Sequence, residues 1–134
     1  MLVLELFTLL NHLIKLKEKL NLMEDKIKIG VSSCLLGEEV RWNGGHKKDR
    51  YVQGVLDNYF DYVPTCPEVD VGMGTPRETV ALYGVLEEHK MISKKSQTDW
   101  TEKMNTYMKG RISTLGKNDL CGYIFKSKSP SCGI

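Results

Sequence analysis

The chain has 134 residues, 41% of them hydrophobic and 27% charged, which is enough for one domain with a modest core. Its 19 basic and 17 acidic residues give a net charge of +2, so the total charge does not indicate binding to nucleic acid, to a membrane surface or to an acidic partner. The 4 cysteines could form two disulfides, but no secretion signal is recognisable. We therefore expect reduced thiols and a cytoplasmic protein.

Residues 1–22 carry leucines that recur at three- and four-residue steps, which predicts an amphipathic helix. The polar face is mixed in sign, which favours packing on the protein's own domain or on a second copy of the chain over binding to a membrane surface. A homodimer through this helix is therefore one expectation. The uncharged run at 6–14 is too short to span a bilayer. We expect an amphipathic helical extension over 1–22 and one α/β domain over 23–134.

The domain begins with an alternating apolar run at 26–33, which predicts a strand that leads into a turn around Cys34. A polar loop follows, with its turn signal at 43–45. Asp49 is the expected N-cap of a helix that runs to about residue 60.

The apolar run at 59–66 predicts a second strand, which delivers Cys66 into another loop. After an irregular, glycine-rich loop, the runs at 79–85 and 89–93 predict two more strands that pair as a hairpin.

Helical spacing of apolar residues over 100–115 predicts the longest helix of the domain, with Gly116 just past its end. The last strand is expected at 119–126, followed by a turn that carries Cys132. The fourth cysteine, Cys121, falls inside this strand, and we expect it to be a small buried side chain.

This order of strands and helices predicts an α/β fold, with a largely parallel, Rossmann-like open sheet and helices on its faces. Cys34, Cys66 and Cys132 all follow strands, and the carboxyl ends of parallel strands meet at one edge, where ligands collect. Three thiolates suit zinc or an iron–sulfur cluster and leave one coordination position open for chemistry. Three buried core cysteines are the alternative, although their turn contexts argue against it.

A fourth ligand could come from His46, but its loop is basic and equally suited to holding an anion. Glu68, two residues after Cys66, is the carboxylate nearest in sequence to the proposed metal and is our candidate for acid–base catalysis. Side chains that could bind the substrate carry hydroxyl, guanidinium or imidazole donors: Ser33, Arg41, His46, Arg77 and Ser129.

Three segments closely resemble the thiouracil desulfidase family: VSSCLLGEEVRWNGGHK at 31–47, VPTCPEVDVGMGTPRE at 63–78 and DLCGYIFKSKSPSCG at 119–133. They occur in the family's order, and the resemblance runs from about residue 26 to the end, leaving residues 1–22 uncovered. It implies a [4Fe-4S] cluster held by three cysteines, which would be Cys34, Cys66 and Cys132 in this chain.

The resemblance also implies the reaction. A thiolated nucleobase such as 2-thiouracil binds the open iron through sulfur, water replaces the sulfur at the ring carbon, and uracil forms without net redox change while sulfide stays on the cluster. Glu68 would manage the protons of the water, and activity should be lost in air. The substrate would be a small thionucleobase or a thionucleoside derived from tRNA.

Relatives usually continue beyond the segment that holds Cys132, whereas this sequence stops two residues later. One expectation is therefore a C-terminal truncation that leaves the site inactive, and another is that the amino-terminal helix covers the gap. Two other functions remain open from sequence: a zinc- or cluster-bearing module that binds nucleotide or RNA, and a cluster protein for electron transfer or sensing.

Overall fold

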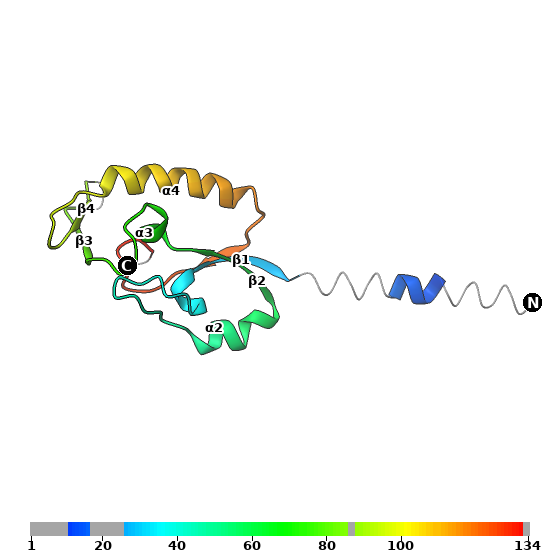
Figure 1. Ribbon diagram of the computed structural model, residues 1–134. Coiled ribbons are helices and arrows are strands. Elements are labelled where there is room, and N and C mark those ends of the chain that lie inside the picture. The colour runs from blue at the N-terminus through cyan, green and yellow to red at the C-terminus, as the bar shows by residue number, and fades with distance from the viewer. Residues whose placement is uncertain (1–10, 17–25, 86–87, 133–134) are drawn as a thin grey trace, which may run out of the picture.

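The computed structural model describes residues 11–16, 26–85 and 88–132. Its centre is a parallel sheet of three strands in the order β2-β1-β5, formed by β1 (Ile27–Ser32), β2 (Phe60–Thr65) and β5 (Gly122–Ile124). The middle strand, β1, has its last four residues buried, as a strand covered on both faces requires. All three strands end at the same edge of the sheet (Figure 1).

A separate hairpin stands beside this sheet. β3 (Val80–Tyr83) and β4 (Lys90–Ser93) pair antiparallel, which confirms the hairpin expected from sequence. Gly84 leaves β3 with φ +101°, and a Cβ there would lie 2.4 Å from the Glu88 carbonyl oxygen, so the close turn requires glycine. The hairpin is not part of the parallel sheet. The α/β class is therefore confirmed, and the Rossmann-like arrangement stays a prediction.

Two of the helices were expected from sequence. α4 (Thr101–Gly116) agrees closely with the predicted range, but Gly116 is its last residue and not the stop just past its end, since Lys117 is the C-cap. α2 (Arg50–Gly54) begins as expected, because Asp49 Oδ1 accepts from the amides of the second and third helical residues at 2.9 and 3.1 Å. It ends earlier than predicted, because β-branched Val55 follows and the chain tightens into the 3₁₀ helix η2 (Leu56–Asn58).

Two short helices were not expected. The 3₁₀ helix η1 (Ser33–Leu36) follows β1, and α3 (Pro67–Asp70) follows β2. Each is about one turn long, which is too short for helical periodicity to show in a sequence.

The sheet separates two clusters of buried side chains. α2 and α4 lie on opposite sides of it (Figure 1). On the α2 side, Val31 at full burial packs with Leu35 and Val52. Beneath α4, Met104 packs with Val71, directly after α3, and with the hairpin, so the hairpin is joined to the domain through this second cluster. The edge where the strands end lies between the two clusters.

The predicted amino-terminal helix lies mostly outside the described residues. Residues 11–16 are helical, and Leu13, Ile14 and Leu16 are 55%, 47% and 44% exposed. Within the described parts of the chain, no helix is long and apolar enough to cross a membrane.

Gly30 in β1 leaves no room for a side chain, because a Cβ there would lie 2.1 Å from Cδ2 of Tyr123 on the neighbouring strand. Gly30→Ala should lower the free energy of unfolding by about 1–3 kcal/mol, the range for overpacking a core. Chemical denaturation of the two proteins measures the change. Gly110→Ala in α4, where nothing lies within 4 Å, is the control and should be neutral or stabilising. Equal losses in both variants would contradict this account.

Candidate metal centre

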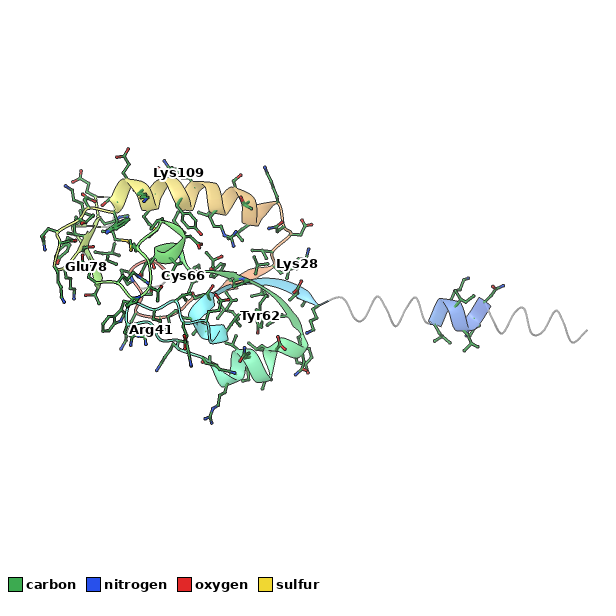
Figure 2. All side chains as sticks on the ribbon, viewed as in Figure 1. Lys28, Arg41, Tyr62, Cys66, Glu78 and Lys109 are labelled. Carbon is green, nitrogen blue, oxygen red and sulfur yellow. The ribbon has the colours of Figure 1, made fainter. Side chains whose placement is uncertain are left out.

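The structure brings Cys34, Cys66 and Cys132 to one cavity of about 250 Å³ at the edge where the strands end. Cys34 lies in η1 directly after β1, and Cys66 is the N-cap of α3 directly after β2. Cys132 arrives on the loop that follows β5. Figure 2 shows Cys66 near this edge and Lys28 toward the opposite one.

The Cys132 thiol acts electrostatically on each of the other two thiols. Burial raises the pKa of the Cys34 thiol, and the neighbouring Cys132 thiol raises it further, whereas Lys126 and Arg41 oppose the shift. Burial also raises the pKa of Cys66, with a smaller contribution from Cys132. Cys132 therefore lies within electrostatic range of both other thiols. The positive charges of Lys126 and Arg41 favour the thiolate form of Cys34.

All three thiols are free, and so is Cys121. Among the described residues, no three His, Cys, Asp or Glu side chains are grouped closely enough to hold a single metal ion. Thiolates that bind separate irons of one cluster stand further apart than the ligands of one ion. Three thiols around one cavity, with cations beside them, are therefore a suitable set of ligands for an iron–sulfur cluster.

A buried ion pair joins the loops that carry these cysteines. Arg77 donates from Nε and Nη2 to Oε2 of Glu68 at 2.9 and 2.6 Å, and the two side chains are 6% and 11% exposed. The other carboxylate oxygen, Oε1, accepts from the Ser131 hydroxyl at 2.7 Å. Both oxygens of Glu68 are thus occupied, and the carboxylate connects the Cys66 loop to the residue next to Cys132.

Arg77 extends this connection to the loop after Cys34. Its Nη1 donates to the carbonyl oxygens of Val40 at 2.9 Å and Gly74 at 3.0 Å, and its backbone amide donates to the Trp42 carbonyl at 2.8 Å. One arginine and one glutamate thereby tie together the loops after β1, β2 and β5.

Side chains of α4 form hydrogen bonds with residues before and after Cys66. Arg111 donates to the Thr65 hydroxyl at 2.7 and 3.2 Å and to the Pro64 carbonyl at 3.2 Å, immediately before Cys66. Tyr107 donates its hydroxyl to Asp70 at the end of α3. The long helix thus fixes the backbone on both flanks of this thiol.

The predicted substrate-binding residues divide into three groups. Ser33, Arg41 and Ser129 line the cavity together with Glu68. Arg77 also lines it, but its guanidinium is committed to Glu68 and to backbone carbonyls. His46 lies outside the lining, and its Nδ1 accepts from the Lys48 amide at 3.1 Å.

The expectation for Cys121 was wrong, because its side chain is exposed. β5 begins only at Gly122 and is an edge strand of three residues, so the residue before it is not enclosed by the sheet.

Several cavity residues were missed by sequence reasoning. Lys126 and Lys128 immediately precede the segment of Cys132, so their proximity to that thiol could have been noticed. Lys94 comes from the end of the hairpin, and no sequence signal connects it to the cysteines. Trp42 follows the predicted donor Arg41 and was not considered.

The 2-thiouracil desulfurase family model matches residues 29–134, which cover the sheet except the first two residues of β1, the hairpin and all three cysteines. The chain belongs to the 2-thiouracil desulfurase family. The resemblance inferred from sequence is thereby confirmed. An uncharacterized protein of Bacillus subtilis (strain 168), YbbK, is 37% identical over 111 residues, 77% of this chain and 71% of the relative.

The chain is also similar in structure to the [4Fe-4S]-dependent thiouracil desulfidase TudS. The match has a TM-score of 0.65 and 28% sequence identity, and it covers 81% of this chain and 70% of the solved one.

Removing one partner of the Glu68–Arg77 pair leaves a buried charge without compensation. Arg77→Ala should therefore lower the free energy of unfolding by about 3–5 kcal/mol, measured by denaturation. Arg50→Ala, at an exposed position of α2, is the matched control and should change the free energy of unfolding by less than about 0.5 kcal/mol. The double variant Glu68→Ala/Arg77→Ala should cost less than the sum of its single variants, and strict additivity would show that the two side chains do not interact.

Proposed function

We propose that this protein removes sulfur from a thiolated nucleobase, converting 2-thiouracil and water to uracil and hydrogen sulfide without net redox change. The observation that carries the proposal is that three free thiols from three separate loops line one cavity. Membership of the 2-thiouracil desulfurase family and similarity to a [4Fe-4S]-dependent thiouracil desulfidase support it.

In this proposal Cys34, Cys66 and Cys132 hold a [4Fe-4S] cluster. Three cysteines for four irons leave one iron without a protein ligand, and the bound cluster supplies a Lewis acid there for the thiocarbonyl sulfur. Burial raises the pKa of Cys34, and Arg41 and Lys126 oppose that rise and so help to keep the ligands ionised.

Glu68 is our candidate for moving the protons. The oxygen of water bonds to the ring carbon, the C–S bond breaks, and both protons of the water end on the departing sulfur. Glu68 lines the cavity and can take a proton from the water and return it to the sulfur. Its fixed position, with Arg77 on Oε2 and Ser131 on Oε1, restricts where that transfer can occur.

The substrate is held by the cavity lining in this proposal. Ser33, Arg41 and Ser129 offer donors to the ring oxygen and nitrogens, while a role for His46 in binding stays a prediction. The free thiols agree with a reducing compartment, and we propose that the protein works in the cytoplasm. A dimer through the amino-terminal helix also stays a prediction.

Substitution of single cysteines tests the cluster. Protein purified and reconstituted without oxygen should contain about four irons and four acid-labile sulfides per chain. Cys34→Ser, Cys66→Ser and Cys132→Ser should each lose most of this iron, measured by metal analysis and visible absorption. Cys121→Ser is the matched control, because its thiol is exposed and outside the cavity, and it should keep the full content. Zinc in place of iron would favour a binding module instead.

The reaction is tested by incubating the reconstituted protein with 2-thiouracil and measuring both uracil and sulfide. Equal amounts of the two products are expected. Glu68→Gln keeps an oxygen to accept from Arg77, so it should keep its iron but lower kcat by about 10²–10⁴-fold, the range for losing an acid–base group. A full cluster that releases no sulfide from thiouracil would point to electron transfer or sensing.

A further inference from the structure

One aromatic side chain, that of Trp42, lines the cavity with the three cysteines, and the role proposed above does not use it. It is 46% exposed, although a large apolar ring is ordinarily favoured inside the protein. The other tryptophan, Trp100, behaves in the ordinary way: it packs against the core cluster beneath α4, and its Nε1 donates to the Ser93 hydroxyl at 3.0 Å. Part of the Trp42 side chain is therefore left uncovered by the rest of the protein.

The backbone beneath this ring is held on both sides. The Gly44 amide donates to the Arg41 carbonyl at 2.9 Å, and the Arg41 amide donates to the Gly45 carbonyl at 3.1 Å, which closes a tight turn around Trp42. The Trp42 carbonyl accepts from the Arg77 amide at 2.8 Å, so the turn is fixed to the residue that pairs with Glu68. An aromatic side chain on a fixed turn loses little conformational entropy when a ligand covers it.

The size of the cavity indicates where a ligand ring would lie. A volume of about 250 Å³ lies below the usual range for sites of drug-sized ligands, and a cluster held by the three cysteines would take part of it. A substrate that reaches such a cluster must also lie against the lining beside it. Among the described residues that line the cavity, Trp42 is the one whose side chain is a flat, largely apolar ring that matches the face of a nucleobase.

We propose that Trp42 is the stacking platform for the substrate ring and that it selects planar heteroaromatic thiocarbonyl compounds over acyclic ones. This inference rests on the function proposed above and names the feature of the substrate that the site recognises. Stacking depends on the face of the ring and not on its hydrogen-bonding edge, so the thiocarbonyl sulfur stays available to the cluster and the ring oxygen and nitrogens to Arg41 and the other donors of the lining.

The test measures binding separately from turnover. Uracil, the expected product, is titrated into the anaerobic, cluster-loaded protein by calorimetry. Trp42→Ala should weaken uracil binding roughly ten- to hundredfold, the range that base stacking contributes, whereas Trp42→Phe should stay within about threefold of the natural protein. Tyr51→Ala is the matched control, since Tyr51 is a 62% exposed ring on α2 outside the cavity, and it should not change binding.

Turnover gives an independent measurement. Trp42→Ala should raise KM for 2-thiouracil with little change in kcat, and it should reduce the preference for 2-thiouracil over acyclic thiourea. Melting temperature and iron content are compared first. If Trp42→Ala lowers the melting temperature or the iron content, Trp42→Phe is compared with Trp42→Leu instead. These two side chains are similar in size, and only phenylalanine has an aromatic face. Weaker uracil binding in Trp42→Leu, with uracil binding retained in Trp42→Phe, then supports stacking on Trp42.

Unchanged binding and KM on loss of the ring would overturn the inference, and so would an equal loss on substitution by phenylalanine and by an aliphatic residue. The two proposals fail in different ways. A natural protein that desulfurises thiouracil and whose alanine variant keeps the same KM refutes only the platform. A natural protein that binds uracil through Trp42 but releases no sulfide refutes only the reaction. A natural protein that neither binds uracil nor releases sulfide refutes both.

Discussion

The carboxylate of Glu68 is the point at which the loops of the metal centre meet. Arg77 occupies one of its oxygens and the hydroxyl of Ser131 occupies the other. Because Arg77 also holds the carbonyls of Val40 and Trp42, a single ion pair relates the segments after β1, β2 and β5. Each segment carries one cysteine. Their mutual position therefore depends on what this pair contacts far along the sequence: Ser131, 63 residues from Glu68, and Val40, 37 residues from Arg77.

Such a pair is strong only where water is excluded, because burial makes the loss of either partner costly. The fold provides that exclusion with two separate clusters of apolar side chains, one beneath α2 and one beneath α4. The cavity lies at the sheet edge between them. α4 contributes twice: Met104 fills the second cluster, and Arg111 and Tyr107 fix the backbone on either side of Cys66. Core and site are thus built by the same elements.

The electrostatic environment of the cysteines follows from the same arrangement. Burial raises the pKa of Cys66, Glu68 raises it further, and Arg77 opposes that effect. The ion pair thus brings an acid–base group close to a thiol, and the lowering effect of Arg77 on the pKa of that thiol is larger than the raising effect of Glu68. Arg41 and Lys126 oppose the effect of burial at Cys34 in the same way. A partly enclosed site for anionic ligands needs such cations, since thiolates are otherwise costly to remove from water.

Local patterns in the sequence were sufficient for most of the fold. The period of apolar residues predicted the three parallel strands, the hairpin and α4, and Asp49 marked the start of α2, because these features depend on neighbours a few residues apart. The short helices η1 and α3 were missed, since one turn carries no period. The exposure of Cys121 was missed as well, since the end of an edge strand is set by its partner strand.

The sequence by itself also determined which residues could carry the chemistry, because thiols and carboxylates that follow strands meet at one edge of a parallel sheet. Only the tertiary structure decided how those residues are used. It turned Arg77 from a possible substrate donor into the partner of Glu68, left His46 outside the cavity lining, and brought Lys94 and Trp42 to the site. Those assignments depend on how separate loops fold against one another, as where Arg77 reaches Val40 across 37 residues, and no local periodicity encodes such contacts.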